Sequence, residues 1–427
     1  MKIFERADGA IFPTITTPAV RQGFVLFAAN SIGNGLQYVY HIFASRLLGP
    51  DEYGVFTSLL ALSVIVAVPA GIAQMLITQY VASFQAREET EKITALVMDS
   101  LGKLTGASFI AGAAMIAASA PIAQFLNVSS NLPVIATAGL FFFTGAITTF
   151  NATLQGLQRF YFLALLGIIA ATVRVIFGLA LIAAGLGVIG ALGGSIIASV
   201  ATATLAFIAL RAHFRLPTRS HGLTMRAVSR YAVLVLGGML ALTVMTNIDL
   251  LIVKHFFTPA EAGYYSAATV LGKTILFFPG AIITLIFPKI SRRFALGKNT
   301  ADLARQSFVV MLGLCGFAAL ALYFFPAFAV RVLFGDQYDA SIPLVGWYGF
   351  AMGLFALVQL LWTIYIAQEE GRFVILLLSV TSALALALWL LHANLLMVIA
   401  SLGLSALTIL IVSEIWLGGL GLVKHGM

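Results

Sequence analysis

Hydrophobic blocks of about membrane-spanning length follow one another along the whole chain. A hydrocarbon core roughly 30 Å thick needs about 20 helical residues to cross it, and this sequence supplies that length repeatedly. Hydrophobic residues make up 61% of the 427 residues and charged residues only 9%, whereas a soluble domain carries about 25% charged residues. The pattern predicts an all-α integral membrane protein, whose function depends on the few polar residues kept inside the membrane.

The hydrophobic runs and the breakers between them predict twelve transmembrane helices. We expect these helices near residues 23–48, 54–82, 97–120, 132–157, 160–185, 188–210, 228–254, 262–288, 305–328, 341–367, 372–392 and 395–417. Only Gly-rich sequence separates the fifth from the sixth, so a tight turn is expected there. Pro69 and Pro279 fall inside the second and eighth helices, and we expect each to kink its helix.

The basic residues predict the orientation of these helices. With the N-terminus in the cytoplasm, nineteen Lys and Arg residues fall on the cytoplasmic side, and three (Arg46, Lys254 and Arg331) fall on the outer side. This asymmetry follows the positive-inside rule, so we expect both termini in the cytoplasm. The formal net charge of +8 therefore reflects membrane topology, and we expect no nucleic-acid binding.

A short internal repeat relates the two halves of the chain. The segment RLLGPDEYGVF follows the first predicted helix and HFFTPAEAGYY follows the seventh. At an offset of 209 residues, Pro50, Glu52 and Gly54 match Pro259, Glu261 and Gly263. Chance similarity between two apolar hairpins is the alternative, but a Pro-x-Glu-x-Gly loop is not generic membrane sequence.

Two halves of six helices each have the same orientation, because six is an even number. Such a parallel repeat is typical of transporters that bind substrate between their halves. The predicted organisation is a cytoplasmic N-terminal segment (1–22), an N-terminal six-helix lobe (23–210), a basic cytoplasmic linker (211–227), a C-terminal six-helix lobe (228–417) and a cytoplasmic tail (418–427). The lobes would enclose a central cavity.

Several longer segments resemble a known family. They are SRLLGPDEYGVFTSLLAL, TLQGLQRF, NIDLLIVKHFFTPAEAGYYSAATVL and FPKISRR. Together with the number of predicted helices, they resemble the polysaccharide-biosynthesis flippases, the O-antigen and exopolysaccharide branch of the multidrug/oligosaccharidyl-lipid/polysaccharide exporter superfamily. The resemblance covers nearly the whole chain, but its short motifs identify the family and not the substrate.

This resemblance implies a V-shaped pair of lobes around a central cavity. It implies that the protein moves a polyprenyl-diphosphate-linked oligosaccharide from the cytoplasmic to the outer leaflet of a bacterial inner membrane. It also suggests polysaccharide polymerases and glycosyltransferases as partners, beside membrane lipid. We expect no catalytic residue, metal or cofactor, because no cluster of His, Cys and acidic residues has metal-ligand spacing.

Polar residues follow one face of the first predicted helix. Asn30, Asn34, Gln37, His41 and Ser45 recur at spacings of three and four residues, which places them on one side of a helix. Hydrocarbon offers no hydrogen-bond partners, so this face must contact protein or water. One interpretation is the wall of a hydrated cavity that binds sugar hydroxyls, and the other is polar packing between helices.

Two basic residues lie deep within predicted helices. Arg174 and Lys273 would each cost at least about 2.5–3.5 kcal/mol in the bilayer centre, so such residues usually face a bundle interior. We predict that both bind an anionic diphosphate. The alternative is a structural ion pair with Asp249. Asp249 itself is predicted either to pair with such a cation or to bind a coupling proton or sodium ion.

Arg46 and Lys254 stand immediately before the two repeat loops. They are candidates for receiving the diphosphate on the outer side, although simple snorkelling to the membrane interface explains them equally well.

Two other functions compete with the flippase. A cation-coupled multidrug exporter should place net negative charge in its cavity, and a membrane polymerase or glycosyltransferase should carry a larger outer loop than this chain has.

Overall fold

The computed structural model describes the backbone of residues 18–211, 229–277, 280, 290, 300–368 and 370–418, and the side chains of these residues except 18–27 and 229–231. Every element in this part of the chain is helical. Eight helices are long and apolar enough to cross a membrane, or nine if one bent pair counts as a single crossing. Large apolar side chains on their outer surfaces, such as Ile110, Phe317 and Phe328, are at least 70% exposed. These features indicate a multi-pass membrane protein.

The helices in the first half of the chain are α1 (Pro18–Val66), α2 (Val68–Ala86), α3 (Thr90–Ala117), α4 (Ser119–Phe125), α5 (Leu132–Gly156), α6 (Phe160–Leu181) and α7 (Gly187–Leu210), with the π-helical turn η1 (Ile182–Leu186) before α7. Those in the second half are α8 (Ser229–Met245), α9 (Ile248–Phe256), α10 (Pro259–Lys273), η4 (Thr274–Leu276), α12 (Ala301–Phe324), α13 (Pro326–Leu333), η5 (Asp336–Ser341), α14 (Ile342–Ala367), α15 (Arg372–Leu390) and α16 (Leu395–Leu417).

The long helix α1 turns back on itself at Gly49, which has φ +71°. His41 Nδ1 lies 3.0 Å from the hydroxyl oxygen of Tyr53, although twelve residues of straight helix would span about 18 Å. Residues up to 48 therefore form the first predicted helix, and residues from 50 onward begin the second. A left-handed φ costs glycine little, so Gly49 permits the reversal.

The predicted turn between the fifth and sixth helices is also present. Gly185 and Gly187 have φ values of +88° and +51°, and α6 packs along α7 after the turn. At Pro69 the expected kink is confirmed: the helices on either side of Ala67 are bent by 45°, and Pro69 stands in the first turn of α2. Pro279, the second predicted kink, lies outside the described residues.

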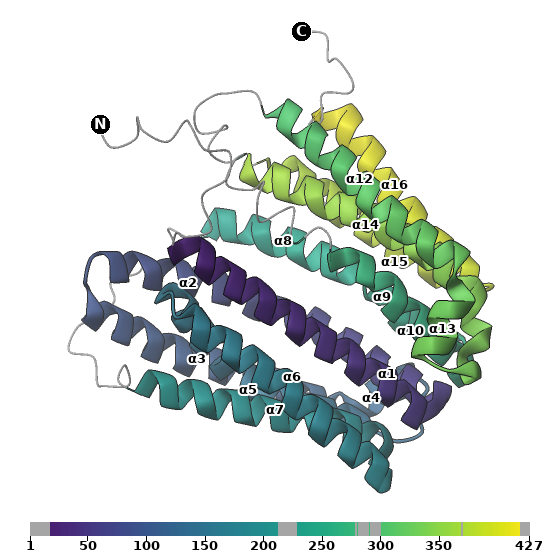
Figure 1. Ribbon diagram of the computed structural model, residues 1–427, viewed down its shortest axis with the longest axis horizontal. Helices are drawn as coiled ribbons and strands as arrows, with labels where there is room; N and C mark the ends of the chain where they lie inside the picture. Colours follow the sequence, from purple (N-terminus) through teal and green to yellow (C-terminus); the bar gives the residue numbers. More distant parts are fainter. Residues whose placement is uncertain are drawn as a thin grey trace.

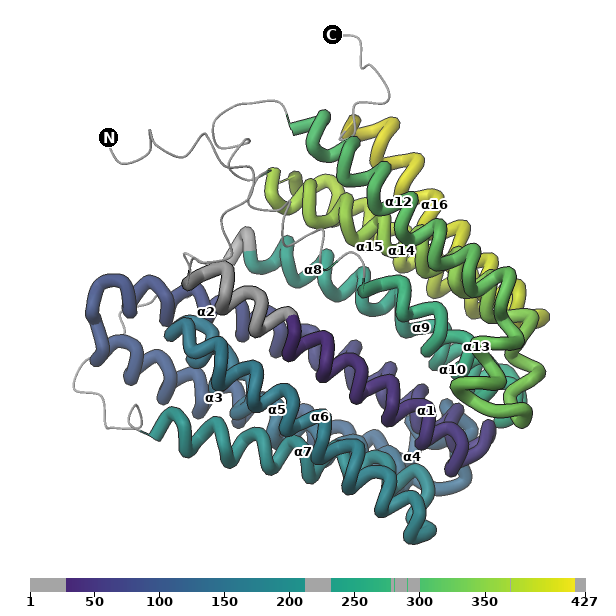
Figure 2. The backbone as a smooth tube through the Cα atoms, viewed as in Figure 1, coloured from purple at the N-terminus to yellow at the C-terminus, as the bar shows by residue number. Residues whose placement is uncertain are grey.

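Helices of each half pack mainly on one another. In the first half α5 contacts α2, α3 and α7, and in the second half α14 contacts α10, α12 and α16. Helix α1 lies between the two sets and contacts both α6 and α10 (Figures 1 and 2). The two halves thus meet mainly through α1 and α10.

The 209-residue offset relates residues that touch in space. The hydroxyls of Thr57 and Ser266, 209 positions apart, lie 2.6 Å from each other. Gly54 and Gly263, also 209 apart, pack so closely that a Cβ on Gly54 would stand 2.9 Å from the Gly263 nitrogen. Equivalent residues that contact each other must lie beside the pseudo-twofold axis that relates their two segments.

A second repeated motif connects the last three helices of each half. Gln155, Arg159 and Phe160 recur as Gln368, Arg372 and Phe373. Arg159 donates a hydrogen bond to the Ala209 carbonyl near the end of α7, and Arg372 lies 6.0 Å from the ring centroid of Trp416 near the end of α16. Both arginines therefore join a loop to the last helix of their own half.

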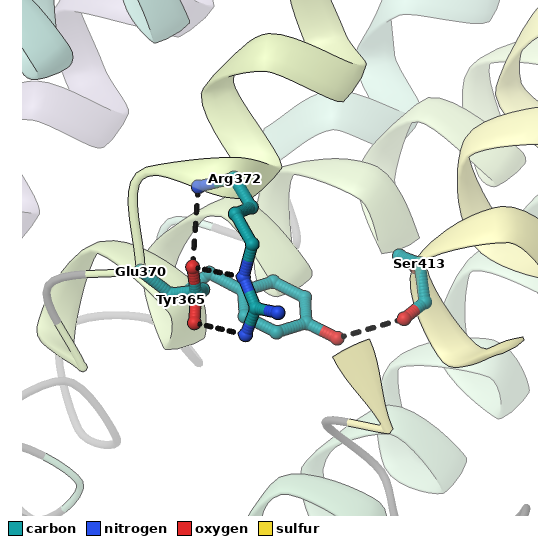
Figure 3. Close-up of polar contacts among 4 residues, drawn as sticks. All are labelled: Tyr365, Glu370, Arg372 and Ser413. Carbon is teal, nitrogen blue, oxygen red and sulfur yellow. Dashed lines mark hydrogen bonds and ion pairs between the residues drawn. The ribbon is translucent and has the colours of Figure 1, made fainter. Parts of the chain in front are cut away.

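Figure 3 shows the second of these loops. Glu370 accepts hydrogen bonds from the backbone nitrogen, Nε and Nη2 of Arg372, at 3.2, 2.9 and 2.8 Å. Beside this pair, the Tyr365 hydroxyl donates to the Ser413 carbonyl at 3.3 Å (Figure 3). These contacts hold the loop between α14 and α15 against α16.

Candidate functional site

A polar cavity of about 450 Å³ lies among α1, α2, α5, α6 and α7. Arg174 lines it from α6, and polar side chains of the neighbouring helices complete the lining: Asn30, Gln74, Asn151, Gln155, Ser199 and Thr202. None of the described residues that line the cavity is acidic. Among these described lining residues, Arg174 alone carries a formal charge.

Arg174 is held in position by a chain of side chains from α1. Its Nη1 donates to Gln37 Oε1 at 2.5 Å, and Gln37 Nε2 lies 3.2 Å from His41 Nε2. An amide nitrogen can only donate, so His41 Nε2 accepts and His41 Nδ1 carries the hydrogen toward the Tyr53 hydroxyl. The bond from Arg174 thus fixes the Gln37 amide, which in turn fixes the His41 tautomer.

The Arg174 guanidinium retains unused donor capacity. The side chain is half-buried, and Nε is buried without a hydrogen-bond partner. A guanidinium presents five N–H donors, of which only the one toward Gln37 is used within the described part of the chain. An unpaired buried donor is costly, so an anion or hydroxyl in the cavity would find a strong partner here.

A second cluster lies where the seventh predicted helix is interrupted. Asn247 has φ −137° and separates α8 from α9. Lys273 Nζ donates to Asn247 Oδ1 at 3.0 Å, and Asn247 Nδ2 donates to the Thr243 carbonyl at 2.8 Å. Broken helices of this kind line substrate and ion sites in transporters.

Asp249 lies in the first turn of α9, next to this break. Its Oδ2 accepts hydrogen bonds from the hydroxyls of Tyr265 and Tyr348, both at 2.9 Å. Oδ1 is buried and has no hydrogen-bond partner among the residues that the structure describes. Within the described residues, neither Lys273 nor Arg174 lies within the 4.0 Å of an Asp249 oxygen that defines an ion pair. The direct ion pair considered above is therefore absent from this conformation.

The polar face of the first helix divides between two environments. Asn30 is exposed and lines the cavity, and Asn34 is also exposed. Gln37 and His41 belong to the chain that holds Arg174. Ser45 is fully buried, and its hydroxyl donates to the Ile42 carbonyl. The face thus contributes both to a cavity wall and to packing between helices.

The two basic residues before the repeat loops have different surroundings. Arg46 is exposed, yet its guanidinium donates to the carbonyls of Val332 and Leu333, at 2.6 and 3.2 Å. Lys254 is buried, with 1% of its surface exposed. Lys254 is therefore inaccessible to a diphosphate in this conformation, and Arg46 already donates two of its N–H groups to the opposite half.

Five polar residues of the cavity were not singled out from the sequence: Gln74, Asn151, Gln155, Ser199 and Thr202. Asn151 and Gln155 are four positions apart in an apolar helix, which places them on one helix face. That spacing was the available signal. Tyr265 and Tyr348 gave no such signal, because they stand 16 and 99 positions from Asp249.

A family of proteins described as polysaccharide biosynthesis proteins matches residues 43–343. The chain belongs to this family. Among its relatives, the probable flippase AglR of Haloferax volcanii is 26% identical over 336 residues. The match covers 76% of this chain and 66% of AglR, just under two thirds of that protein. The resemblance to polysaccharide-biosynthesis flippases is confirmed at the level of the family.

Solved structures show the same fold. An inward-facing multidrug resistance MATE family transporter of the MOP superfamily aligns with a TM-score of 0.69 at 14% identity, over 95% of this chain and 99% of the transporter. The lipid II flippase MurJ, in an inward closed conformation, aligns with a TM-score of 0.68 at 12% identity, over 93% and 87%. The polysaccharide biosynthesis protein therefore has the fold of these membrane transporters.

Proposed function

We propose that the protein is a flippase that moves a polyprenyl-diphosphate-linked oligosaccharide from the cytoplasmic to the outer leaflet by alternating access. The observation that supports this most is the chemistry of the cavity, where one guanidinium stands among four carboxamides and two hydroxyls. A guanidinium forms strong charge-assisted hydrogen bonds with phosphate oxygens. Carboxamides both donate to and accept from sugar hydroxyls.

We propose twelve transmembrane helices in two six-helix lobes, with both termini in the cytoplasm of a bacterial inner membrane. The lobes would be residues 23–210 and 228–417, joined by the basic linker 211–227, with cytoplasmic segments 1–22 and 418–427. The reversals at Gly49 and Gly185 support separate crossings where the backbone is otherwise nearly continuous. The short helices α4 and α13, which each follow the third helix of a half, support the repeat.

In the proposed cycle, Arg174 binds the diphosphate, and the cavity amides with Asn30 and Asn34 hold the first sugars. Lys273 would provide a second contact in the other half, beside the broken helix. The polyprenyl chain would remain in lipid. Rocking of the halves would then uncover Lys254 and release Arg46 on the outer side, where both could receive the diphosphate.

We propose that Asp249 couples this cycle to a cation. Its Oδ1 is buried and unpartnered, while two tyrosine hydroxyls hold Oδ2. A carboxylate oxygen without a partner is suited to bind a proton or a sodium ion. This role also distinguishes the flippase from an exporter of cationic drugs, for which an acidic group should line the cavity itself.

Translocation of a lipid-linked glycan in proteoliposomes tests the proposal. Arg174→Gln keeps a donor for Gln37 but removes the charge, and Lys273→Gln does the same toward Asn247. Both variants should lose most of the activity. Arg372→Gln is the matched control, because its guanidinium is exposed and pairs with Glu370. Wild-type rates in both test variants would remove these two residues from the mechanism.

A further inference from the structure

Two sets of reciprocal hydrogen bonds join the halves at the end of the molecule that carries α4 and α13. In the first set, Arg46 donates to the carbonyls of Val332 and Leu333, at the C-terminal end of α13. Gln337, shortly after that helix, donates in return to the Arg46 carbonyl at 3.4 Å. We call these contacts the arginine latch.

The second set has the same design with the halves exchanged. His255 Nδ1 lies 2.6 Å from the carbonyl of Phe125, the last residue of α4. A carbonyl can only accept, so Nδ1 donates. Asn127, two residues after α4, donates in return to the His255 carbonyl at 2.6 Å. We call these contacts the histidine latch.

The two latches occupy equivalent positions in the repeat. Arg46 and His255 are 209 residues apart, the offset that also relates Thr57 to Ser266. In each latch a cationic or imidazole side chain from the end of a first helix binds the carbonyl end of the short helix in the opposite half. Carbonyls at a helix C-terminus lack intrahelical partners and favour such donors.

Aromatic packing strengthens the histidine latch. The His255 ring stacks on Phe125 of the opposite half, with centroids 4.3 Å apart and planes inclined by 9°. On its own half it stacks with Trp389 at 5.6 Å and 14°. Stacked rings of this kind add to the burial of apolar surface. The histidine latch therefore joins the halves through packing as well as through hydrogen bonds.

Beneath the latches the halves meet along a line of small residues. Gly54 and Gly263 pack backbone to backbone, and the Thr57 and Ser266 hydroxyls share a hydrogen bond about one helical turn further along. Ser266 is 1% exposed. We call this contact the glycine seam. Among the described residues, the latches and the seam thus bring the two halves into direct contact at this end.

We propose that the arginine and histidine latches are a paired gate that holds this end closed, and that both must release before the halves can separate there. This inference rests on the proposed alternating access. It gives Arg46 and His255 a gating role in the conformation described, and it assigns Asn127 and Gln337 to the same gate.

A buried cysteine reporter tests the gate without any substrate. Ser266→Cys is introduced into a Cys315→Ala background, and its rate of reaction with a hydrophilic maleimide is measured in lipid nanodiscs. Arg46→Ala or His255→Ala should raise the rate by about 2- to 10-fold for each hydrogen bond lost. Asn127→Ala and Gln337→Ala, which each remove one return bond, should raise it toward the lower end of this range.

Arg331→Ala is the matched control. Arg331 is a charged, exposed residue at the same end, but it pairs with Asp339 of its own half, at 3.0 and 2.8 Å. Its substitution should leave the labelling rate unchanged. Equal rates in the parent and all four latch variants would overturn the gate.

Failure of the gate and failure of the proposed function give different results. Labelling of Ser266→Cys requires no lipid-linked sugar, so an incorrect substrate leaves the labelling result intact. Conversely, unchanged labelling in the latch variants leaves the loss of translocation in Arg174→Gln intact. If Arg46→Ala or His255→Ala does not fold, the two return-bond variants still decide the question.

Discussion

A single methyl group added to the glycine seam should push the halves apart. A Cβ on Gly263 would collide with the carbonyl oxygen, carbonyl carbon and Cα of Pro50. These are backbone atoms of the opposite half, which cannot rotate away as a side chain can. Gly263→Ala is thus an overpacking substitution whose cost falls only on the closed seam.

The magnitude follows from two opposing effects. Overpacking costs about 1–3 kcal/mol, and alanine gains about 1 kcal/mol over glycine within a helix. The helical gain is present whether the seam is closed or open, so it cancels from the equilibrium between these states. That equilibrium should shift toward the open state by about 5- to 150-fold, while the free energy of unfolding of the closed protein falls by only about 0–2 kcal/mol.

Pulsed electron paramagnetic resonance measures this equilibrium directly. Spin labels at Leu132 and Val332, both more than half exposed, lie at the α4/α13 end of the two halves. Gly263→Ala should add a population at longer distance. Gly316→Ala is the control, because a Cβ there meets no atom within 4 Å, and it should leave the distances unchanged. Identical distributions for the two variants would refute the reasoning.

Three further predictions concern other parts of the account. Tyr348→Phe removes one of the two hydroxyls that donate to Asp249. Hydrogen bonds to charged groups contribute about 1.5–3 kcal/mol, so the free energy of unfolding, measured by thermal unfolding, should fall by that order. Gln155→Leu keeps the cavity's shape but removes an amide, so the affinity for the lipid-linked glycan should fall, whereas the affinity for a bare prenyl diphosphate should not. The Arg372 guanidinium lowers the pKa of Glu370, so the pair stabilises the folded protein above the unfolded pKa of about 4.3. The small loss of stability in Glu370→Gln at neutral pH should shrink as the pH falls from about 4 through the lowered pKa of Glu370 in the folded protein, and a loss that does not depend on pH would contradict the assignment.

The sequence predicted those features that depend on local composition. Apolar runs of membrane-spanning length indicated the helices, because a span needs little more than length and hydrophobicity. The kink near Pro69 also followed from local chemistry, since proline removes a backbone donor. Arg174 could be singled out because an arginine in an apolar run is costly and therefore informative.

Other features depend on contacts between distant segments, which local patterns do not show. The break at Asn247 lies in a run that reads as one continuous helix. Helices α4 and α13 lie mostly in segments that were predicted as loops, because the predicted third and ninth helices ended at residues 120 and 328. The contacts of Arg46 could not be predicted, because the carbonyls that it binds belong to residues almost 290 positions later.

A structure with bound ligand tests the central claim most directly. The protein would be imaged in nanodiscs with a short-chain prenyl diphosphate that carries one sugar. The account predicts diphosphate density within hydrogen-bond distance of Arg174, with the sugar beside Asn151 and Gln155. Diphosphate density elsewhere, with Arg174 still bound only to Gln37, would contradict it.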